Sequence, residues 1–63
     1  MTELERLYQN MADTLEQGMT DLEKFEAGNM SAGTRVRKNM QIIKDLAQKV
    51  RIAVQEQKNA VAN

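Results

Sequence analysis

Three cations stand close together in the middle of the chain, where Arg35, Arg37 and Lys38 follow the segment GNMSAG at residues 28–33. Arginine and lysine bind phosphate oxygens through charge-assisted hydrogen bonds. At the start of a helix, free backbone N–H groups also attract an anion. Helix starts ordinarily favour acids, and a cation there is unfavourable by about 0.3 kcal/mol or more. The cluster therefore indicates an anion-binding position that helix stability alone does not explain.

Neighbouring residues extend this predicted site in two directions. Gly33 is expected to leave its backbone uncovered and, with Thr34, to offer amide groups to a phosphate. Four cations recur every seven residues and so line one flank of a helix, about 10 Å apart: Arg37, Lys44, Arg51 and Lys58. Lys44 and Arg51 are expected to continue the contact along a polyanion. The alternative is that this flank meets acids such as Glu16 and Glu23 within the same molecule.

Other kinds of chemistry have little support. The chain has no cysteine and no histidine, so disulfides, the commonest metal ligand and the commonest general base are missing. Asp13 and Glu16 indicate a solvated helix face more simply than a carboxylate metal site. No nucleophile, nucleotide-binding phosphate loop or catalytic pair is recognisable. We therefore expect no enzyme, no cofactor, no metal site and no small-molecule substrate.

The composition predicts an all-α protein. The 63 residues include no proline, only two aromatic residues and many strong helix formers, and they form at most one small domain, residues 1–63. A first helix is predicted over about 3–27, with a capping box between Thr2 and Glu5. Gly18 is expected to allow close approach of a facing helix. The apolar stripe of this helix consists of Leu4, Leu7, Tyr8, Met11, Leu15, Met19, Leu22 and Phe25.

A turn over about 28–31 separates this helix from a second one, predicted over about 32–60. Gly28 is placed to take the left-handed conformation that ends the first helix, and Ser31 is expected to cap the second. So short a turn makes the helices antiparallel neighbours. The net charge is −5 for residues 1–29 and +5 for residues 30–63, so the two helices differ in sign.

The second helix has two apolar strips, and one partner helix cannot cover both. The first is expected to pack within the hairpin, and consists of Val36, Met40, Ile43, Ala47, Val50, Val54 and Val61. The second, Ile42, Leu46 and Ala53, is then left for another protomer. The predicted fold is an antiparallel two-helix hairpin that forms a homodimer resembling a four-helix bundle.

The segment GNMSAGTRVRK, followed by an amphipathic helix, resembles the bacterial linker-histone-like nucleoid proteins of the chlamydial type. Gly28, Asn29, Ala32, Arg35 and Arg37 fit that family's pattern over roughly residues 20–59. Met30 stands where a lysine is usual, and the chain does not show the lysine-rich tail that many members carry. The resemblance implies compaction of DNA through phosphate contacts with little sequence preference.

The leading hypothesis is therefore non-sequence-specific binding of double-stranded DNA through the start of the second helix. The alternative is a helical interaction module that binds another protein and not DNA. The N-terminal residues MTELER do not indicate a signal peptide, and no apolar run is long enough to cross a bilayer. The expected location is the cytoplasm, at the bacterial nucleoid, with no membrane partner.

Overall fold

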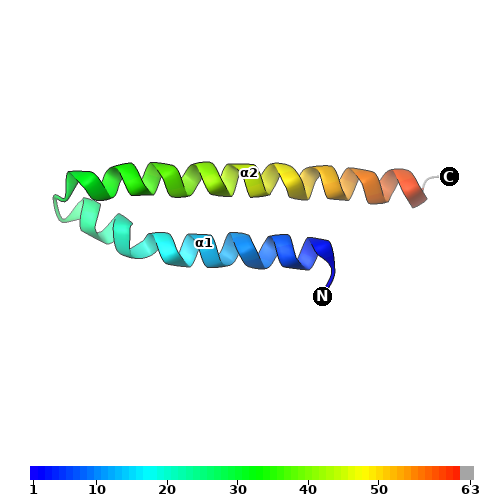
Figure 1. The fold of residues 1–63 in the computed structure, drawn as a ribbon, viewed down its shortest axis with the longest axis horizontal. Coiled ribbons are helices and arrows are strands. Elements are labelled where there is room, and N and C mark those ends of the chain that lie inside the picture. Colours follow the sequence, from blue (N-terminus) through cyan, green and yellow to red (C-terminus); the bar gives the residue numbers. More distant parts are fainter. Residues whose placement is uncertain (62–63) are drawn as a thin grey trace.

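The fold is a hairpin of two helices. The computed structural model describes residues 1–61, which form α1 (Glu3–Glu26), a short turn and α2 (Met30–Val61). The helices run antiparallel and side by side, and α2 continues past the N-terminal end of α1 (Figure 1). The predicted all-α hairpin is confirmed at this level.

The start of α1 is held by the predicted capping box. The Thr2 hydroxyl accepts a hydrogen bond from the Glu5 amide at 3.1 Å, and the Thr2 amide donates to Glu5 Oε1 at 2.9 Å. These bonds satisfy two backbone donors that have no acceptor inside the helix. Arg6 and Glu3 form an ion pair in the same turn.

The turn ends α1 through Gly28, which has a positive φ of 107°. The Gly28 amide donates to the Phe25 carbonyl and the Asn29 amide to the Lys24 carbonyl, both at 2.9 Å. This pair of bonds is a Schellman motif, which favours glycine because a side chain is strained at such a φ. The predicted role of Gly28 is confirmed, and α1 ends one residue earlier than expected.

The second helix begins earlier than predicted, at Met30. The reason is Asn29, whose Oδ1 accepts a hydrogen bond from the Ala32 amide at 3.2 Å. Asparagine is among the best N-cap residues because its short side chain reaches the amide three positions on. The expected cap at Ser31 is therefore wrong, and the turn is shorter than the predicted 28–31.

The facing sides of the two helices agree only in part with the apolar stripes predicted from the sequence: Val36, Ile43, Ala47 and Val50 face α1 as expected. Half-buried positions of α2 recur at intervals of three and four, and they include Val36, Asn39, Ile43, Leu46, Ala47, Val50 and Ala53. Met40, Val54 and Val61, which were expected in the hairpin, are exposed. Asn39 explains the difference, because its amide donates to the Thr14 carbonyl of α1 at 2.8 Å and so allows a polar residue between the helices.

Gly18 lies directly under Asn39, as the close approach predicted for this glycine requires. A Cβ added to Gly18 would lie 2.5 Å from Asn39 Oδ1, which is too close for any side chain to fit unless Asn39 moves. The same facing side of α1 includes the buried Leu7 and the half-buried Met11 and Thr14.

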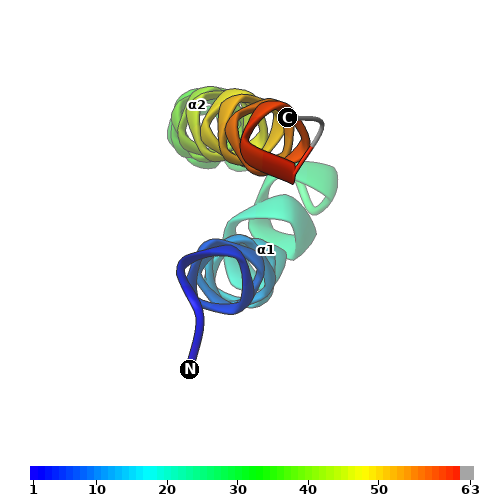
Figure 2. The ribbon, with the colours of Figure 1, turned by 90° about the vertical axis from the view of Figure 1, so that its right-hand side faces the viewer.

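The hairpin buries very little within one molecule. Leu7 and Ala32 are the only buried apolar residues within 1–61. The shape explains this, since the Cα trace measures 54 × 19 × 11 Å. The smallest dimension is about the diameter of one helix, roughly 10–12 Å, so the molecule is one layer with two open faces (Figure 2). Neither helix in the described part is long and apolar enough to span a membrane.

Candidate nucleic-acid interface

The first turns of α2 carry cations and no acid. The first turn of this helix has no acidic residue, and Arg35, Arg37 and Lys38 follow within two turns. Residues two positions apart on a helix point in different directions, because each residue turns the direction by about 100°. Arg35 and Arg37 therefore lie on different sides of α2, and the predicted cluster is divided.

Arg35 is engaged inside the hairpin. Its Nε donates to Asp21 Oδ1 of α1 at 2.8 Å, and both side chains remain partly exposed. An exposed pair of this kind contributes about 0–1 kcal/mol. Arg35 therefore fastens α2 to α1 beside the turn, and its charge is partly compensated there.

Arg37 and Lys38 have no such compensation. Both side chains are exposed, and neither forms an ion pair with any residue in the described range 1–61. Their cationic groups can be reached by a phosphate without breaking a contact of the hairpin. Of the predicted cluster, these two residues are the free cations nearest to the start of α2.

The backbone amides available at this end differ from those predicted. With Asn29 as N-cap, the amides of Gly33 and Thr34 fall beyond the first four N–H groups, which are the ones that lack an intrahelical acceptor. The Asn29 and Ala32 amides are bonded to the Lys24 carbonyl and the Asn29 side chain. Met30 and Ser31 therefore carry the free amides. The high N-cap preference of Asn29 was the signal that could have located them.

Gly33 is covered on one side, contrary to expectation. A Cβ at this position would lie 2.7 Å from two ring carbons of Phe25, so the aromatic ring occupies the space of a side chain. Gly33 is half-buried in consequence. The glycine is therefore needed for the contact with Phe25, whereas Thr34 beside it is exposed.

The basic flank of α2 does not meet the acids of α1. Arg37, Lys44, Arg51 and Lys58 are all exposed, and none of them forms an ion pair within residues 1–61. The two ion pairs of the described chain are Arg6–Glu3 and Arg35–Asp21. Charge pairing inside one hairpin therefore does not explain the seven-residue repeat of cations.

Comparison with known protein families finds a match to the family described as histone H1-like protein Hc1, over residues 5–60. The match covers both helices and the turn. The chain belongs to the histone H1-like Hc1 family. Searches of curated proteins and of solved structures gave no match.

Membership of the Hc1 family confirms the resemblance inferred from the turn and the Arg35–Arg37 pair. The family consists of histone-like DNA-binding proteins and is not a family of enzymes. It implies a DNA-binding nucleoid protein, and the residues that contact DNA have to be inferred from this chain's own geometry.

Proposed function

We propose that the start of α2 binds the phosphate backbone of double-stranded DNA without reading its sequence. The observation that carries the proposal is the pair of exposed cations Arg37 and Lys38, which form no ion pair within residues 1–61 and lie about two turns along α2 from the free amides of Met30 and Ser31. Helix starts of this kind attract anions. Contacts to phosphates position a protein on the duplex but carry no sequence information.

Further cations extend the proposed contact. Arg35 can donate to a phosphate while its Nε donates to Asp21, because the planar guanidinium has five N–H donors. Lys44 and Arg51 continue along the flank that begins at Arg37. Thr34, which is exposed and directly precedes Arg35, can donate its hydroxyl. The proposed location is the bacterial nucleoid, and the proposed active form is a homodimer, which doubles the number of anchors.

A salt titration of DNA binding tests this function. If about three to four phosphates are neutralised per protomer, log K should fall with log salt at a slope near −3 to −4, and a dimer that engages both anchors could double it. Duplexes of unrelated sequence should bind with similar affinity. A strong preference for one sequence, or binding that barely changes between low and physiological salt, would contradict the backbone contact.

The alternative, a helical module that binds protein and not DNA, is favoured by one observation. Large apolar side chains are exposed on both helices, including Tyr8, Leu15, Met19 and Met40. The same titration separates the two functions, because an interaction module would show no binding of DNA at low salt.

A further inference from the structure

An apolar seam follows the outer part of α1. It consists of Tyr8, Ala12, Leu15, Met19 and Leu22, at alternating intervals of four and three residues. Tyr8 is 65% exposed, Leu15 52% and Met19 51%. Regular three-four spacing of apolar residues is the pattern of a helix that packs against another helix. Within the hairpin this seam is uncovered.

The second helix has a matching seam on the same face of the hairpin. Met40 and Val54, which are 45% and 41% exposed, flank Ala47 at intervals of seven residues. On both helices the seam residues directly follow the positions that face the other helix, as Leu15 follows Thr14 and Met40 follows Asn39. In antiparallel helices a step of about 100° past the facing positions leads to the same side of the pair. The two seams therefore form one apolar face.

This face has borders of opposite charge. Beyond the α1 seam, on the edge of the hairpin away from α2, lie Glu5, Glu16 and Glu23. Beyond the α2 seam, on the edge away from α1, lie the cations of the basic flank, Arg37, Lys44, Arg51 and Lys58. None of these charged groups forms an ion pair within residues 1–61.

We propose that this face packs against the same face of a second copy of the chain, with α1 of each copy lying over α2 of the other. A two-fold axis parallel to the helices produces this arrangement, in which the four helices are antiparallel to their neighbours as in an up-and-down bundle. The acidic border of each copy then runs along the basic border of the other. The reverse stacking, α1 over α1, would place like charges together.

The positions of the residues along the helix axis, here called their heights, agree with this pairing. Inside the hairpin Phe25 lies level with Gly33, Asp21 with Arg35 and Gly18 with Asn39. An axis parallel to the helices leaves every residue at its own height, so the same levels hold between copies. Glu5 of one copy then lies near Arg51 of the other. Glu16 lies between the levels of Arg37 and Lys44.

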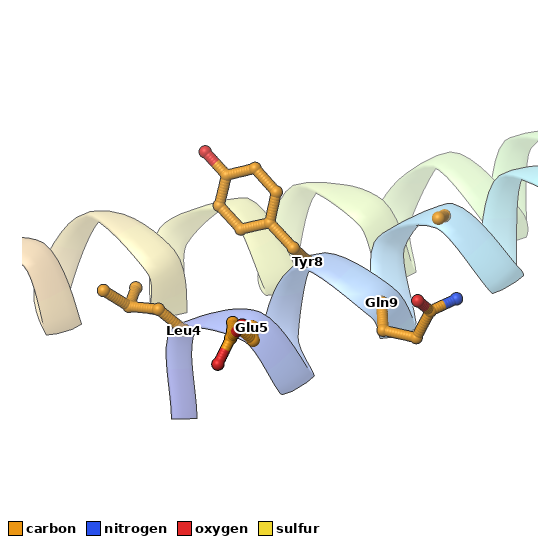
Figure 3. Close-up of a pocket in the computed structure, with 5 residues that line it drawn as sticks. Leu4, Glu5, Tyr8 and Gln9 are labelled. Carbon is orange, nitrogen blue, oxygen red and sulfur yellow. The ribbon is translucent and has the colours of Figure 1, made fainter. Parts of the chain in front are cut away.

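Tyr8 finds a complementary surface at its own level. Its ring extends from α1 beside a shallow hollow lined by Leu4, Glu5, Gln9 and Ala12 (Figure 3). At about the corresponding height α2 has a second hollow around the small side chain of Ala47, bordered by Lys44, Asp45, Gln48 and Arg51. A large side chain opposite a hole formed by four residues is the packing unit of helix bundles. Tyr8 of each copy therefore enters the hollow around Ala47 of the other.

This inference goes beyond the proposed DNA binding and does not depend on it. It does change the role proposed for part of the basic flank. In the dimer Lys44 and Arg51 lie beside the second copy's acids and not against DNA. Both turns fall at the same end of the dimer. That end then carries Arg37 and Lys38 of both copies as the phosphate contact.

Two variants with the same substitution at similar exposure test the face. Leu15→Glu changes the proposed interface, and Ile42→Glu changes a residue that is 49% exposed on the opposite side of α2 and belongs to the strip with Leu46 and Ala53. Sedimentation equilibrium should give a dimer for the parent and for Ile42→Glu, and at least about tenfold weaker association for Leu15→Glu. The inference would be overturned if Ile42→Glu dissociated into monomers while Leu15→Glu remained a dimer.

Charge reversal tests the pairing of the borders. One variant changes Glu16 and Glu23 to Lys, and the other changes Arg37 and Lys44 to Glu. Glu5 is left unchanged because it belongs to the capping box of α1. Each alone should associate more weakly than the parent, and a mixture of the two should restore association as a heterodimer. A mixture no stronger than its components would exclude the cross-pairing. DNA binding is measured separately: a parent chain that binds DNA as a monomer would remove only this inference, and a dimer that does not bind DNA would remove only the proposed function.

Discussion

Glu5 links the start of α1 to pH. Its pKa lies below the ordinary value of 4.5, first because its carboxylate accepts a hydrogen bond from the Thr2 backbone amide and second because of the bond with the Thr2 side chain. The ionised form is therefore favoured by folding. A group of this kind contributes its stability above its ordinary pKa and loses it as the pH falls through the lower value in the folded chain.

We expect the helicity of the parent to decrease on acidification below about pH 4.5 partly through this carboxyl group. Glu5→Gln keeps an acceptor in the capping box but cannot titrate, so its circular dichroism should depend less on pH in that range. Glu3→Gln, in the same turn but outside the capping box, serves as control. Equal acid sensitivity of Glu5→Gln and the parent would contradict the assignment.

Gly33 and Phe25 provide a second test at the level of single residues. Because the ring occupies the place of a Cβ, Gly33→Ala must displace it and should lower the melting temperature. In a Phe25→Ala background the ring is gone, and the same substitution should stabilise the helix by up to about 1 kcal/mol through propensity alone. A double-mutant cycle from thermal melts measures this change of sign. Identical effects in both backgrounds would mean that the ring does not restrict this position.

The two helices show which parts of the fold can be predicted from the sequence. Gly28 and the capping box are local signals, because their partners lie within a few residues, and both were identified correctly. Asn39 was missed because a search for apolar positions passes over a polar residue. Its amide is tolerated only because the Thr14 carbonyl, 25 positions away along the chain, lies opposite it. The true facing side of α2 depends on that long-range contact.

Asn39→Ala tests the importance of this polar contact between the helices. The lost hydrogen bond to the Thr14 carbonyl should cost about 0.5–1.5 kcal/mol. Asn10→Ala, at an exposed asparagine on α1, is the matched control, because both substitutions gain up to about 0.7 kcal/mol of helix propensity and only Asn39→Ala loses a bond between the helices. Chemical denaturation of both variants measures the difference. Equal stability of the two would place Asn39 outside the structural contacts of the hairpin.

The candidate site also has parts that the sequence predicts and parts that it does not. The exposed cations Arg37 and Lys38 could be predicted from their position after the turn, since nothing distant changes their surroundings within the hairpin. The pairing of Arg35 with Asp21 could not, because it requires the helices to be aligned. The amides of Met30 and Ser31 were missed because the helix start was placed at the wrong residue.

At the level of the whole molecule, the opposite charges of the two helices have a consistent explanation. The seven acids of residues 1–29 would repel DNA if they faced it. In the proposed dimer Glu5, Glu16 and Glu23 lie along the second copy's cations, and the turn end keeps an excess of positive charge. The acidic helix then guides assembly, while the start of α2 contacts DNA.

The most direct test of the DNA contact compares two double variants in the same helix. Arg37→Gln with Lys38→Gln removes the proposed anchor, and Lys49→Gln with Lys58→Gln removes two exposed cations far from the turn. Both have the same net charge, and each removes one cation of the basic border, Arg37 or Lys58. Sedimentation of both variants separates a change in assembly from a change in the DNA contact. In gel-shift titrations the first should bind at least about tenfold more weakly, with a salt slope smaller by about 2 for each chain in contact. Equal losses of affinity in the two variants, or unchanged affinity of the first, would contradict a DNA contact at the start of α2.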